Sequence, residues 1–191
     1  MRWDDLFRDL EAQLTAAADA ELDAEVADRS RREAARLALV DRARAATGRP
    51  VVLRVAGAGA MEGRLLGVGS GWLLLTDGTD RAAGSEGECL VPLPAVLSVS
   101  GLAAWTATAD AAGQVGARLG LGVVLRGIAR DRSGLAVTLV DGSTFTGTLD
   151  RVGADFVEVS EHGPGEPRRP GAVTGVRTVP FPALAVLRRG P

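Results

Sequence analysis

The sequence contains one histidine, His162, and one cysteine, Cys89, so it offers few groups for metal binding, acid–base catalysis or thiol chemistry. A zinc site or a nucleophile–base pair needs several such groups close together. His162 stands between Glu161 and Gly163, a setting that predicts a solvated loop histidine. Cys89 is expected to be a small buried strand residue. We therefore predict no catalytic residue, no metal site and no cofactor, and a protein that is not an enzyme.

Two glycine-rich stretches, residues 67–71 and 116–122, have the composition of phosphate-binding loops. Neither leads from a strand into a helix with the Gly-x-Gly-x-x-Gly spacing that such a loop requires. Bends and a linker explain these glycines better, because glycine is the residue that tight turns favour. The sequence therefore indicates no nucleotide site.

All 22 basic residues are arginine, because the chain has no lysine. The chain also lacks asparagine, and this bias is typical of a GC-rich bacterial genome. This composition excludes a lysine Schiff base, a P-loop lysine and an asparagine contact to adenine. The net charge of −2 gives no overall attraction to nucleic acid, so binding would need a local patch. The candidates for polyanion or partner contacts are Arg126, Arg130, Arg132, Arg168, Arg169, Arg188 and Arg189. Solvated and ion-paired arginines are the alternative.

The first 47 residues contain neither glycine nor proline and are rich in helix formers, which predicts a helical arm. A second helix is expected to begin at Ser30, because Glu33 completes a capping box. Residues 1–28 carry nine acids and two arginines, whereas residues 29–49 carry seven arginines and two acids. This polarity fits a solvated helix, two antiparallel helices or a dimerising or partner-binding arm. The apolar residues of the candidate partner arm are Trp3, Leu6, Phe7, Leu10 and Leu14.

After Gly48 the sequence changes to short apolar runs that are broken by Gly, Pro or Asp-Gly, a pattern typical of β-strands. The predicted strands of the first half are 51–55, 63–66, 72–76, 90–93 and 96–99. A shift of 84 residues, which becomes 88 after a longer loop, superimposes the second half on the first. Matching glycines, prolines and apolar positions predict a tandem repeat. The predicted segments are a helical arm (1–34), a first repeat (35–101), a linker (102–118) and a second repeat (119–191).

Each predicted repeat resembles the Sm-like fold, on the residues Gly63-Arg64-Leu65 and Gly147-Thr148-Leu149 with the strands that follow them. The resemblance implies α+β architecture: the helical arm followed by two tandem helix-plus-five-stranded Sm-like β-barrels. In RNA-binding members an Asp and an Asn after Gly-x-Leu hold a base. The Asp positions here carry Gly69 and Gly153, and the Asn positions carry Leu73 and Val157. The family's RNA site is therefore not carried over to this chain.

These patterns predict a non-enzymatic interaction or scaffold protein, built on a tandem pseudo-dimer of Sm-like barrels. Its expected partner is another protein or a second copy, bound through the helical arm or the barrel edges. The alternative is a nucleic-acid-associated protein that uses arginine patches on the barrels. No apolar run approaches the ~18 residues of a membrane span. With a single cysteine and an acidic N-terminus, we expect no membrane partner and a cytoplasmic location.

Overall fold

A computed structural model describes residues 3–77, 87–102, 119–163 and 173–189. The predicted linker, apart from Leu102, and two of the candidate arginines, Arg168 and Arg169, lie outside these ranges. The chain divides into two compact units, residues 1–38 and residues 39–191. The first unit is helical and the second is rich in β-strands.

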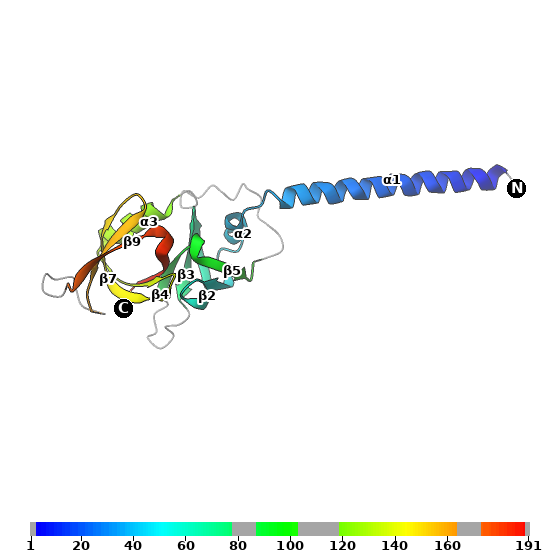
Figure 1. The fold of residues 1–191 in the computed structure, drawn as a ribbon. Coiled ribbons are helices and arrows are strands. Elements are labelled where there is room, and N and C mark those ends of the chain that lie inside the picture. Colours follow the sequence, from blue (N-terminus) through cyan, green and yellow to red (C-terminus); the bar gives the residue numbers. More distant parts are fainter. Residues whose placement is uncertain (1–2, 78–86, 103–118, 164–172, 190–191) are drawn as a thin grey trace. The chain divides into compact units, whose positions relative to one another are not determined.

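Helix α1 (Trp3–Ala34) is a single helix of 32 residues (Figure 1). Its sequence contains no glycine or proline to interrupt it, so the helix formers propagate one helix through the whole segment. The predicted helix start at Ser30 is wrong, because Ser30 lies inside α1. Ion pairs of Asp28 with Arg31 and Arg32, three and four residues away, support the helix there instead.

The described residues of the second unit form two further helices, two short 3-10 turns and ten strands. The helices are α2 (Leu39–Ala45) and α3 (Leu121–Asp131), and the 3-10 turns are η2 (Leu93–Ala95) and η5 (Phe181–Ala183). The strands of its first half are β1 (Pro50–Val55), β2 (Gly59–Gly69), β3 (Trp72–Asp77), β4 (Gly87–Pro92) and β5 (Val96–Ser100). The strands of its second half are β6 (Gly134–Leu139), β7 (Thr144–Val152), β8 (Phe156–Glu161), β9 (Gly175–Pro180) and β10 (Leu184–Arg189).

All ten strands belong to one antiparallel sheet in the order β5-β1-β2-β3-β4-β10-β6-β7-β8-β9. The prediction of two tandem helix-plus-five-stranded barrels is therefore wrong. The physical reason is the pairing of β4 with β10, through Leu90 with Leu187 and Cys89 with Arg188, which joins the two halves. The sheet is not closed, since β5 and β9 form its two edges.

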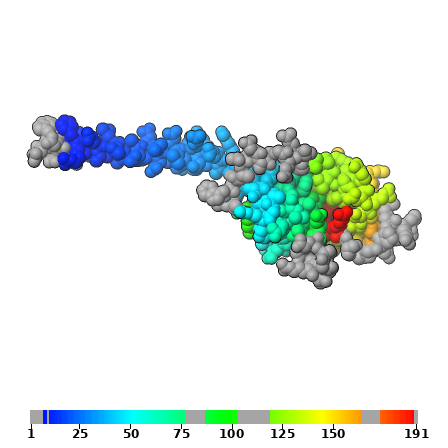
Figure 2. All heavy atoms as spheres, turned by 180° about the vertical axis from the view of Figure 1, so that it is seen from behind, coloured from blue at the N-terminus to red at the C-terminus, as the bar shows by residue number. Residues whose placement is uncertain are grey.

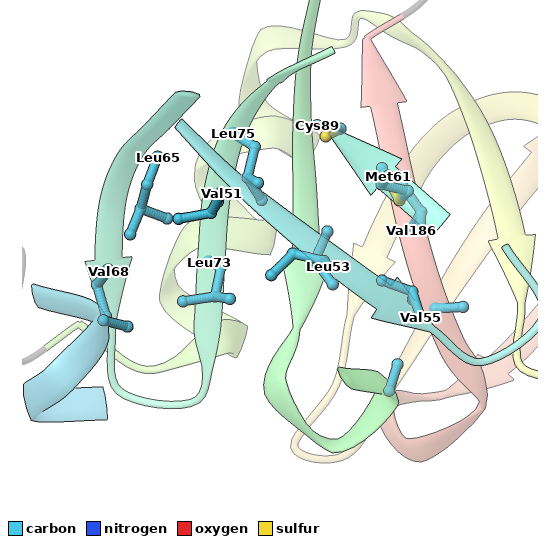
Figure 3. Close-up of a cluster of buried hydrophobic side chains, with 14 of the residues drawn as sticks. Val51, Leu53, Val55, Met61, Leu65, Val68, Leu73, Leu75, Cys89 and Val186 are labelled. Atoms are coloured by element: carbon cyan, nitrogen blue, oxygen red, sulfur yellow. The ribbon is translucent and has the colours of Figure 1, made fainter. Parts of the chain in front are cut away.

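The joining strands are buried on both faces, which ties the two halves into one core. In β4, Cys89 and Val91 face the first apolar cluster, whereas Leu90 faces the second. In β10, Val186 belongs to the first cluster and Leu187 to the second. Figure 3 shows Val186 and Cys89 beside the β1 side chains of the first cluster. A space-filling view shows the first half, in cyan to green, directly against the second half, in yellow-green (Figure 2).

A second contact between the halves joins two hairpin turns. Gly57, in the turn between β1 and β2, has a φ of +71°. A Cβ atom there would lie 2.1 Å from the carbonyl oxygen of Leu139 and 2.7 Å from the nitrogen of Gly142. Leu139 ends β6 and Gly142 lies in the turn that leads to β7, so the two turns approach at a distance that only glycine permits.

Candidate functional site

Helix α3 presents two of the candidate arginines to solvent. Its inner face buries Leu125 against the second apolar cluster, and Val124 and Ile128 pack beside it. Because residues four apart share a helix face, Arg126 and Arg130 both lie on the exposed side. Arg132 follows in the left-handed conformation that ends the helix, with a φ of 52°.

The end of β10 carries the other two candidate arginines that the structure describes. Arg189 lies beside the end of α3, with Nη2 3.6 Å from Oδ2 of Asp131 and 3.4 Å from Oγ of Ser133. Arg188 instead donates to Thr138 Oγ1 at 3.5 Å and to Met61 Sδ at 3.9 Å. The fold therefore brings Arg189 to the C-terminal end of α3, where the ion pair with Asp131 reduces its positive charge.

A pocket of about 210 Å³ lies where α3 covers the β4–β10 junction. Its walls are apolar: Leu74, Leu90, Val124, Ile128, Leu135 and Leu187. Its rim is polar: Glu88, Asp131, Ser133 and Arg189. The rim pairs a serine hydroxyl with a guanidinium and offers no base within hydrogen-bond reach of that hydroxyl among the described contacts. This pocket is better suited to the binding of an apolar group than to the catalysis of acyl or phosphoryl transfer.

His162 occupies a buried position, 6% exposed, so the prediction of a solvated loop histidine is wrong. Its Nδ1 lies 3.0 Å from the carbonyl oxygen of Gly163 and its Nε2 lies 2.9 Å from Oγ1 of Thr148. Since a carbonyl can only accept, Nδ1 donates to it, and the Thr148 hydroxyl, which can donate or accept, forms a hydrogen bond with Nε2. Both ring nitrogens therefore have partners within the protein, which is the arrangement of a structural histidine.

The described part of the chain shows no group of three His, Cys, Asp or Glu side chains that could hold a metal ion. Cys89 is buried in β4, as predicted. Residues 67–71 form the end of β2 and its turn into β3, rather than a strand-to-helix loop. No helix among the described residues is long and apolar enough to cross a membrane.

Helix α1 exposes every side chain that the structure describes in it. Phe7, Leu10 and Leu14 of the predicted arm are between 45% and 71% exposed. The side chains of Trp3 and Leu6 lie outside the described set. Leu22 and Val26, which are not among the predicted arm residues, are 60% and 56% exposed. The signal that could have found them is the four-residue spacing, which continues through Ala18 to Leu22 and Val26.

The two edge strands of the sheet are mostly exposed. In β5, Leu97 is 65% exposed, and in β9 Val176 is 63% exposed. Arg177 of β9 pairs with Glu161 at 2.7 Å, and its guanidinium lies 4.4 Å from the centre of the Phe145 ring. Charged residues on an edge strand discourage pairing with other chains.

Comparison of the chain with protein-family models, with curated proteins and with solved structures found no match. The resemblance to Sm-like proteins therefore stays a prediction.

Proposed function

We propose that the protein is a non-enzymatic interaction or scaffold protein that captures a protein partner through α1. The observation that carries the proposal is a helix of 32 residues in which every described side chain is exposed. Helices in proteins gain most of their stability by packing an apolar face, so a long helix with exposed leucines has a face left to cover. A protein partner is the occupant that covers such a face.

The sheet unit supports this proposal as the folded body of the scaffold. Its apolar side chains form two clusters that share the junction strands, and its one described histidine has both ring nitrogens satisfied. Neither arrangement supplies a nucleophile with an adjacent base. With its single cysteine, the scaffold is proposed to work in a reducing cytoplasm.

Removal of residues 1–38 tests the proposal, because these residues form a unit of their own. We expect the shortened chain to keep its β-sheet circular dichroism and cooperative melting while it loses partner capture in a pull-down from the native cytosol. An unchanged set of captured proteins would contradict the proposal.

Nucleic-acid association is the second candidate, favoured by the exposed Arg126 and Arg130 on one face of α3. Phosphate contacts are strongest at low salt, so labelled RNA and DNA should bind at ~50 mM salt and dissociate as salt rises. The double variant Arg126→Gln/Arg130→Gln should then weaken binding. Fluorescence anisotropy measures both effects, and failure to bind at ~50 mM salt removes this candidate.

Self-association through the sheet edges is a third route to a scaffold, because β5 and β9 each have one side on which no described strand pairs. Light scattering on the full chain and on the chain lacking residues 1–38 separates the routes. If the chain lacking residues 1–38 still forms an oligomer, the sheet edges rather than α1 mediate the self-association.

A further inference from the structure

An apolar row runs along α1 at a constant spacing of four residues. Leu10, Leu14, Leu22 and Val26 expose between 45% and 71% of their surface, and Ala18 fills the position between the two pairs. Side chains four apart are neighbours on a helix surface, so these five form one continuous row. The row turns by about 40° around the helix at each step, so Leu14, Ala18 and Leu22 share one face, and Leu10 and Val26 lie toward its two sides. Ala18, the small residue at its centre, lets a partner backbone approach.

Acidic residues border this row on both sides. Residues 10–28 contain six acids and no arginine. At 3.6 residues per turn, Glu21 and Glu25 follow one side of the row, and Asp19 and Asp23 follow the other. Among the described residues no ion pair engages any of these four carboxylates, whereas Asp28 already pairs with Arg31 and Arg32. Beside Ala18, Leu22 and Val26, the row is therefore an apolar strip between two negative margins.

The negative charge of these margins determines which kind of partner can bind to the row. A second copy of α1 centred on Ala18 would bring six acids against six, which like-charge repulsion disfavours. Nucleic acids and anionic lipid surfaces are repelled for the same reason. A helix with an apolar face and basic flanks satisfies both the row and its margins. We propose that α1 binds a basic amphipathic helix of a partner protein along Leu10, Leu14, Ala18, Leu22 and Val26.

This inference deepens the proposed function and rests on it. Its probe is a labelled peptide of about 24 residues with leucines at four-residue spacing and arginines on both flanks, titrated with the intact protein and followed by fluorescence anisotropy at 0.15 M salt. The matched peptide carries glutamate in place of each arginine. We expect saturable binding of the basic peptide and none of the acidic one. Equal binding of both peptides, or none of the basic one, overturns the inference.

Two pairs of variants locate the binding on the helix. Leu14→Ser/Leu22→Ser should weaken the basic peptide ~30-fold or more, because two apolar anchors are lost. The control Ala16→Ser/Ala20→Ser places the same residue on the opposite face and should leave the affinity within about 2-fold. Equal losses in the two double variants would mean that helix content, rather than the row, was measured, and would overturn the assignment to the row.

The acidic margin is tested with two double variants that change the net charge of the protein by the same amount. Glu21→Gln/Glu25→Gln should weaken the basic peptide by ~3- to 10-fold, the effect of two exposed ion pairs. Glu62→Gln/Glu88→Gln removes two exposed carboxylates from the sheet unit and should have no effect beyond about 2-fold. A larger loss in the second double variant would place the binding at the sheet, where Glu88 borders the pocket, and would overturn the inference.

Two further results separate this inference from the proposed function. If deletion of residues 1–38 abolishes partner capture but the basic peptide does not bind, the partner chemistry is wrong and the interaction function stands. If light scattering shows a dimer that Leu14→Ser/Leu22→Ser dissociates, a second copy covers the row, which also overturns the inference.

Discussion

The centre of the sheet and its edges are built from similar apolar runs, yet they differ in burial. In β4 and β10, at the centre, four consecutive residues of each strand are buried. In β5 and β9, at the edges, only one residue is buried, Val179. The centre therefore carries the stability of the sheet and holds the two halves together, while the edges remain available to solvent and to other chains. Four predictions test this division, in decreasing order of effect.

The largest expected effect is at the centre of the sheet. Leu187→Ala in β10 removes a side chain that is buried in the second cluster and pairs across the junction with Leu90. We expect a loss of about 2–5 kcal/mol in the free energy of unfolding, from lost burial and the cavity left behind. Leu97→Ala in the edge strand β5 is the control and should stay within about 0.5 kcal/mol. Urea denaturation measures both, and equal losses would contradict the division.

The turn-to-turn contact between the halves is tested by two glycines of the same hairpin. Gly57 and Gly59 have φ values of +71° and +74°, so alanine strains the backbone at both by about 1–2 kcal/mol. Only at Gly57 does the new Cβ also meet the Leu139 carbonyl oxygen, since nothing lies within 4 Å at Gly59. Gly57→Ala should therefore lower the melting temperature clearly more than Gly59→Ala. The reverse order would show that the turns do not press on each other.

Trp72 of β3 forms a third link, because it packs in the second cluster. Its indole Nε1–H donates to the carbonyl oxygen of Leu119 at 2.9 Å, just before α3. Trp72→Phe keeps an aromatic ring but removes this donor and leaves a small gap. We expect a loss of about 1–2 kcal/mol in the free energy of unfolding, measured by denaturation. A loss below about 0.5 kcal/mol would mean that this hydrogen bond contributes little to the link.

The strands could be predicted from the sequence because short apolar runs separated by glycine, proline or Asp-Gly are a local signal. The partner of each strand could not, since Leu90 and Leu187 are as compatible with two separate barrels as with one sheet. The predicted helix start at Ser30 was wrong because most residues around Ser30 are good helix formers and no glycine or proline interrupts the helix there. His162 was misplaced because its hydrogen-bond partner, Thr148, lies on another strand, fourteen residues earlier in the chain. Of the candidate site, the exposed row of α1 was predicted only as far as Leu14.

The smallest expected effect concerns the turn that faces Gly57. Asp141 Oδ1 accepts hydrogen bonds from the nitrogen and the hydroxyl of Ser143, at 2.8 Å and 2.7 Å. The Ser143 side chain, and then its backbone N–H, lower the pKa of Asp141 below its ordinary value. A lowered pKa in the folded state means that the charged turn stabilises the protein at pH values above the unfolded pKa of about 3.9. This stability is lost as the pH falls through the folded pKa.

Asp141→Asn keeps an acceptor oxygen but removes the charge. The melting temperature of this variant should therefore lie below that of the unsubstituted protein at pH 7, and the difference should shrink as the pH falls below about 4. Asp155→Asn is the control, because the Asp155 side chain makes no hydrogen bond among the described contacts. If the Asp141 difference were the same at pH 7 and pH 2.5, charge would have no part in holding this turn, and the contact with Gly57 would rest on shape alone.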